Sequence, residues 1–178
     1  MTGTLPGLEP VTRSAASLSP CGTYRYRLTR HWGAMDQPSN AATFVMLNPS
    51  TADANLDDPT IRRCIGFARA WGCTGLVVVN LYALRSTNPK GLWTVEDPAG
   101  PGNDNELART LRGAALRDTP LVAAWGVHAR PGRVEQVMAL PGADRFTCLG
   151  TTKDGSPRHP LYVRGDTPRT PFTVAPTG

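Results

Sequence analysis

The sequence predicts an α/β fold: a three-layer sandwich with helices flanking a mostly parallel central sheet of about four strands. Two short runs of buried-type side chains, residues 44–47 (FVML) and 75–81 (GLVVVNL), are typical of strands. Between them, residues 59–71 carry apolar side chains at helical spacing. A strand, a helix and a strand in that order form a right-handed crossover, which makes the two strands parallel.

A single domain is expected for a chain of 178 residues. Residues 1–20 and 165–178 are rich in Gly, Pro, Ser and Thr and offer little apolar surface to bury. We therefore expect a flexible leader over 1–20, one α/β domain over 21–164 and a flexible tail over 165–178.

The first expected element is a half-exposed edge strand over residues 23–29. Its side chains alternate, with Tyr24, Tyr26 and Leu28 on one face and Arg25 and Arg27 on the other. The buried strand over 44–47 follows, and the proline at position 49 stops it from pairing further.

The crossover helix has clear ends. Asp58 is a good N-cap residue and Pro59 a good first helical residue. Gly72 suits the C-terminal stop. The apolar face consists of Ile61, Cys64, Ile65, Ala68 and Trp71. The next strand, 75–81, is continuously apolar, so we expect it to be covered on both faces.

The second half of the chain predicts a long loop over 85–102 with several proline and glycine turn signals. A helix follows over 105–117, with Asn103 or Asp104 as its cap. The remaining expected elements are strands at 121–125 and 146–149, a helix at 131–140, a polar loop at 151–160 and a strand fragment at 161–163.

Charge and cysteine content limit the function classes. A net charge of +5 permits an anionic partner, but the arginines are scattered and form no basic tail. The four cysteines form no CxxC pair, so their spacing fits neither a zinc ribbon nor an iron–sulfur site. With no signal peptide and no apolar run long enough for a bilayer, we expect a reduced, cytoplasmic protein with no membrane partner.

Three polar residues stand at the expected strand ends: Asn48, Asn80 and His159. If the strands are parallel neighbours, these residues share one rim of the sheet. One asparagine in such a place more often satisfies loop backbone. Two asparagines and a histidine indicate a site, because an amide offers a donor and an acceptor to a nucleobase edge and histidine can donate to a developing anion.

Longer segments carry a family resemblance. The chain contains MLNPSTAD, DDPTIRRC, VVVNLYALRSTNP, NDNEL, AAWG and LGTTKDGSPRHPLYV. Together they resemble the prokaryotic and phage family known as domain of unknown function 1643, over nearly everything from residue 24 to 163. This resemblance implies no activity.

The order strand–NP, strand–N, strand–WG, loop–HP is also similar, more distantly, to the uracil-DNA glycosylase superfamily. That resemblance implies that Asn48 positions water, Asn80 reads the base edge and His159 stabilises the departing base, without metal or cofactor. The chain departs from the pattern in lacking a Gly-rich lead and a serine after Pro160. The stacking aromatic is open between Tyr82, Trp93 and Phe67.

Further residues near the rim complete the predicted site. Asp53 or Asp57 could act as a general base beside Asn48, or could merely serve the loop or pair with Arg62, Arg63 or Arg85. The predicted substrate-binding residues are Pro49, Ser50, Thr51, Asn80, Tyr82, Arg85, Trp125, Gly126, Lys153 and Arg158.

The leading prediction is hydrolysis of an N-glycosidic bond in a nucleic acid or nucleotide, by a protein expected to be a monomer. A first alternative is a nucleic-acid- or nucleotide-binding module without chemistry. A second is a phosphoesterase in which the clustered aspartates and a histidine hold Mg²⁺ or Mn²⁺. A pocket joining Asn48, Asn80 and His159 favours the first, a shallow basic rim the binding module, and convergent carboxylates the phosphoesterase.

Overall fold

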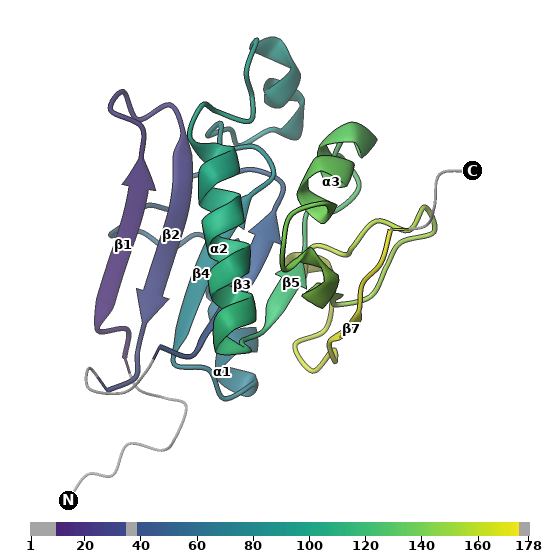
Figure 1. Ribbon diagram of the computed structural model, residues 1–178. Helices are drawn as coiled ribbons and strands as arrows, with labels where there is room; N and C mark the ends of the chain where they lie inside the picture. Colours follow the sequence, from purple (N-terminus) through teal and green to yellow (C-terminus); the bar gives the residue numbers. More distant parts are fainter. Residues whose placement is uncertain (1–9, 35–38, 175–178) are drawn as a thin grey trace, which may run out of the picture.

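The protein is known from a computed structural model that describes residues 10–34 and 39–174. Its centre is one sheet of seven strands in the order β1-β2-β4-β3-β5-β6-β7 (Figure 1). The strands are β1 Arg13–Leu18, β2 Arg25–His31, β3 Ala41–Met46, β4 Gly75–Asn80, β5 Leu121–Ala123, β6 Thr147–Cys148 and β7 Thr170–Pro171. The α/β class is confirmed, but the expected number of about four strands is wrong.

The central strands are parallel and the outer ones are not. β4, β3, β5 and β6 pair in parallel, whereas β1 and β2 on one side and β7 on the other pair antiparallel. Crossover helices marked the parallel centre in the sequence, and β2 was expected as an edge strand over 23–29. β1 and β7 were not predicted, because no crossover helix marks them.

Helices cover both faces of the sheet (Figure 1). α1 (Pro59–Ala70) lies behind the sheet, and α2 (Asn103–Arg117) and α3 (Pro131–Met138) lie in front of it. Short 3-10 helices occupy Pro89–Thr94, Ala143–Arg145 and Pro160–Tyr162. In the described parts of the chain, no helix combines the length and apolarity needed to cross a membrane.

Successive side chains along the strands point to opposite faces of the sheet, so they enter two separate hydrophobic cores. Phe44 and Val78 belong to the core under α1, whereas Val45 and Val79 belong to the core under α2 and α3. Every residue of β4 is buried. The sequence prediction that this strand is covered on both faces is confirmed.

Helices α1 and α2 begin differently: a side chain caps α1, whereas α2 has no side-chain cap. Asp58 caps α1 as predicted, since its Oδ1 accepts the Ile61 N–H at 2.9 Å. α2 begins at Asn103, so the prediction of Asn103 or Asp104 as its cap is wrong, and Gly102 takes that position. Asn103 instead points into the core, where its Nδ2 donates to the carbonyls of Asn80 (2.9 Å) and Leu81 (3.1 Å).

Both expected loose ends contribute to the sheet. β1 lies inside the predicted leader and pairs along its whole length with β2. β7 lies inside the predicted tail, and Phe172 beside it is buried against Trp125. Residues 1–9 and 175–178 are outside the described part of the chain. The expected strand fragment at 161–163 is wrong, because Pro160 opens a 3-10 helix there.

β2 corrects a further expectation. It lies between β1 and β4 and is therefore not an edge strand. Its pairing with β1 shifts at the turn-proximal end, where Ser17 is opposite Arg27 and Leu18 is opposite Arg25. The shift breaks the strict alternation that was expected. Arg25 and Arg30, at 2% and 3% exposure, are buried.

Candidate functional site

A cavity of about 390 Å³ opens at the carboxyl ends of the parallel strands. β3 pairs with β4 on one side and β5 on the other, which is the arrangement that leaves a crevice beyond the strand ends of an open α/β sheet. The cavity brings together Asn48, Asn80 and His159 from three separate segments of the chain. Their predicted convergence on one rim therefore agrees with the cavity lining.

Asn48 follows β3 and has a fixed amide orientation. Its Nδ2 donates to the carbonyl oxygens of Pro49 (3.0 Å), Leu84 (3.5 Å) and Ser86 (2.8 Å). Three carbonyls around one end of the amide identify that end as nitrogen. The Oδ1 atom accepts no hydrogen bond from any described residue, so the side chain presents an acceptor to the cavity.

Asn80 ends β4 and is 1% exposed. Neither its Oδ1 nor its Nδ2 has a hydrogen-bond partner among the described residues. Leaving a buried polar group unpaired costs about 1–3 kcal/mol, so such a group calls for an explanation. Asn80 also belongs to the cavity lining, so this unpaired amide lies beside the cavity.

His159 stands at the cavity wall, immediately before the 3-10 helix at Pro160–Tyr162. Its Nδ1 accepts the N–H of Leu161 at 3.2 Å. Burial lowers the pKa of His159 below its usual value, with an opposing contribution from Asp58. A neutral ring with Nδ1 as acceptor carries its proton on Nε2, which leaves that N–H as a donor.

Two charged residues of the cavity were not predicted as site residues. Arg25 donates through Nη1 to the Ala52 carbonyl, while its buried Nε has no partner among the described residues. Burial lowers the pKa of Arg25 to about 10. Asp58 lines the same cavity while capping α1 through one carboxylate oxygen. No sequence signal marks Arg25, because only the irregular pairing of β2 turns it inward.

The aromatic residues at the cavity are not the expected stacking candidates, although Trp125 was predicted as a substrate-binding residue. Trp125, which lines it, is buried with edge-on contacts to Phe146 and Phe172. Tyr162 is 78% exposed at the rim, and its ring centre lies 5.5 Å from that of His159. The three aromatic residues named as stacking candidates lie outside the lining: Tyr82, Trp93 and Phe67.

The other predicted site residues divide into two groups. Among the described residues that line the cavity are four of the predicted ones: Ser50, Trp125, Gly126 and Arg158. The described lining does not include Pro49, Thr51, Asp53, Asp57, Tyr82, Arg85 or Lys153. Asp53 accepts the N–H groups of Asn55 and Leu56 in its own loop, and Asp57 pairs with Arg30 at 2.8 Å.

The clustered aspartates do not converge. Within the described ranges, no group of three or more His, Cys, Asp or Glu side chains is arranged to hold a metal ion. Asp53, Asp57 and Asp58 instead serve a turn, an ion pair and a helix cap. Of these three carboxylates, the one that reaches the cavity is Asp58, for which the sequence predicted a cap.

Comparison with known proteins gives a family and no activity. The family model described as "Protein of unknown function (DUF1643)" matches residues 25–161, and no curated protein matches the chain. A crystal structure of L-tryptophan dehydrogenase from Nostoc punctiforme is similar at a TM-score of 0.33 and 11% identity. It covers 78% of this chain, which spans 37% of that one, and a likeness so weak carries no argument. The resemblance to the uracil-DNA glycosylase superfamily gains no support from these comparisons.

Proposed function

Because this chain belongs to the DUF1643 family, which brings no established reaction, we propose a function from the site itself: hydrolysis of an N-glycosidic bond in a nucleic acid or nucleotide. The observation that carries the proposal is the unpaired amide of Asn80 at the floor of a cavity that Asn48 and His159 also line. A nucleobase edge supplies a donor and an acceptor side by side, as that amide requires.

The attacking water would lie on the Asn48 side of the cavity. Asn48 Oδ1 is an unoccupied acceptor whose direction is fixed by the three carbonyls around Nδ2. It can accept one water hydrogen, but an amide is too weak a base to remove it. Asp58 supplies the carboxylate in this lining and takes that proton as the water oxygen bonds to the sugar carbon.

The base would leave on the His159 side. When the C–N bond breaks, its electron pair stays with the base, which becomes anionic. The Nε2–H of His159 is free to donate to that anion, because Nδ1 is occupied by the Leu161 N–H. Tyr162, exposed at the rim beside His159, offers a face for stacking an extruded base.

The test is a base-release assay. The protein is incubated with modified and deaminated bases in single-stranded DNA, duplex DNA and free nucleotides, and free base and abasic or ribosyl products are detected by mass spectrometry. His159→Ala should fold normally and reduce turnover by about 10²–10³-fold, the usual loss for one anion-stabilising donor. His31→Ala, a histidine on β2 outside this cavity, is the matched control and should retain turnover.

A second variant separates recognition from chemistry. Asn80→Asp replaces the amide donor by an acceptor, so it should change which base is accepted, because the edge offered to the base has changed. A broad panel without any released base, together with equal nucleic-acid binding by wild type and His159→Ala, would reject the enzyme and leave a binding module.

A further inference from the structure

A second hollow, of about 230 Å³, lies between α2 and strands β2, β3 and β4. Its floor is made by the amino-terminal parts of β3 and β4, at Thr43 and Val77. It therefore lies at the other end of these strands from the cavity that holds Asn80, and the two share no lining residue among those described. None of the described residues that line it is acidic.

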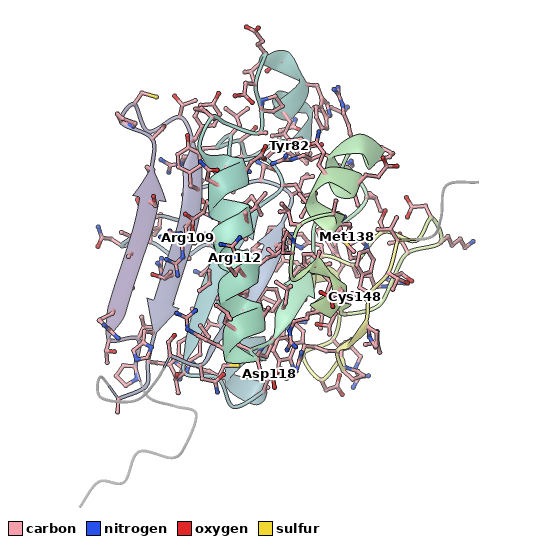
Figure 2. The ribbon with its side chains drawn as sticks, viewed as in Figure 1. Tyr82, Arg109, Arg112, Asp118, Met138 and Cys148 are labelled. Carbon is pink, nitrogen blue, oxygen red and sulfur yellow. The ribbon has the colours of Figure 1, made fainter. Side chains whose placement is uncertain are left out.

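Three arginines surround this hollow: Arg27 from β2, and Arg109 and Arg117 from α2. Figure 2 shows Arg109, with Arg112, on α2 in front of the sheet. The neighbouring carboxylate, Glu106, is occupied by Arg109 at 2.7 Å and by the Thr110 hydroxyl at 3.2 Å. One carboxylate beside three guanidinium groups leaves an excess of positive charge.

The Arg27 guanidinium has an ion pair but no hydrogen bond with any described residue. Its buried Nε lies 3.7 Å from Glu106 Oε1. Burial lowers the pKa of Arg27, and Arg109 and Arg117 lower it further against the opposing effect of Glu106. A part-buried cation with repelling neighbours and no hydrogen bond is stabilised when an anion enters.

We propose that this hollow, defined by Arg27, Arg109 and Arg117, is a binding site for a small phosphate dianion or the terminal phosphate of a phosphomonoester. Arginine suits this ligand, because its fork of N–H donors matches phosphate oxygens. The hydroxyls of Thr43 and Thr119 line the same space and can donate to further oxygens. The site is independent of the reaction proposed above, since it lies at the other end of the strands and shares no described lining residue with the first cavity.

The experiment titrates inorganic phosphate into the full chain by calorimetry at pH 8, with sodium chloride replaced so that ionic strength stays constant. Saturable binding is expected. Arg117→Gln should weaken it about tenfold or more, as expected for loss of a charge-assisted bond. Arg27→Gln provides a second, independent variant and should weaken binding in the same way. Arg112→Gln is the control. Arg112 is on the same helix and carries the same charge, but it is not among the described residues that line this hollow, so the affinity for phosphate should stay unchanged.

The outcomes separate two sources of phosphate. Competition by a nucleoside monophosphate, but not by a thymidine oligomer without terminal phosphates, supports a free monoester. An oligomer that displaces phosphate and binds more tightly would overturn the proposal in favour of a phosphodiester backbone. Equal weakening by Arg117→Gln and Arg112→Gln, or no saturable binding by wild type, would overturn it as a non-specific charge effect.

Discussion

Two buried arginines of β2, Arg30 and Arg25, lie in neighbouring regions and differ in how many hydrogen-bond partners they have. Arg30 is enclosed by the loop between β3 and α1, where it pairs with Asp57 and donates to the carbonyls of Thr29, Asp53 and Leu56. Arg25 faces the cavity and donates to the Ala52 carbonyl, while its Nε has no partner among the described residues. The two are equally buried, so burial does not distinguish them.

This difference in hydrogen bonding follows the surroundings of the two arginines: Arg30 holds a loop, whereas Arg25 lines the cavity. At the loop between β3 and α1, each guanidinium nitrogen of Arg30 donates to a carbonyl or carboxylate within the protein. Where a ligand is expected, Arg25 Nε and both ends of the Asn80 amide have no partner among the described residues, which costs stability. In this pair of arginines, the residue that holds a loop is thus more completely hydrogen-bonded than the residue that lines the cavity.

The largest expected effect tests this comparison directly. Arg30→Met should reduce the free energy of unfolding by about 3 kcal/mol, because Asp57 and the loop carbonyls lose their partner. Arg25→Met, the same change on the same strand, should cost about 1 kcal/mol or less, since it also removes an imperfectly paired buried charge. Urea unfolding of both variants measures the two values. Equal losses would remove the distinction between the two regions.

The sequence predicted some of the elements and site residues involved in this contrast, but not all of them. Apolar periodicity and the Asp58–Pro59 start predicted α1, and polar residues after apolar runs predicted Asn48 and Asn80. The inward position of Arg25 was hidden, because it depends on how β2 pairs with β1, a strand expected to be a loose leader. The double role of Asp58 was also hidden, because a cap signal says nothing about its second oxygen.

A smaller effect is expected for two buried asparagines whose Nδ2 groups differ in pairing. Asn103 donates through Nδ2 to two carbonyls, although its Oδ1 has no partner among the described residues. Neither end of the Asn80 amide has a partner among those residues. Asn103→Leu should cost about 1–3 kcal/mol, because those carbonyls lose their donor. Asn80→Leu, of similar shape, should be neutral or slightly stabilising, because an unpaired amide is replaced by an apolar group.

Thermal unfolding of the two leucine variants gives the comparison without any assay of activity. Asn80→Leu should then also fail in the base-release assay, so that stability and function change in opposite directions at one position. A marked loss of stability in Asn80→Leu would show that its amide is paired in the folded protein, and would weaken the proposed base-reading role.

The smallest expected effect concerns the pH dependence of stability through His159. Its folded-state pKa lies below the unfolded value of about 6.5, chiefly because of burial. Between the two values the unfolded chain binds more protons, so the contribution of His159 is complete above about pH 6.5 and is lost as pH falls through the lowered pKa. The melting temperature of wild type relative to His159→Gln should therefore be higher at pH 8 than at pH 5.

Asp58 sharpens this test because its carboxylate opposes the effect of burial on His159. Asp58→Asn keeps a good N-cap while removing that charge, so it should lower the pKa of His159 further. The pH-dependent difference in melting temperature caused by His159→Gln should then be larger in the Asp58→Asn protein than in wild type. If that difference is flat with pH in both proteins, the imidazole is solvated in the folded state, and Nε2 loses its defined direction toward the cavity.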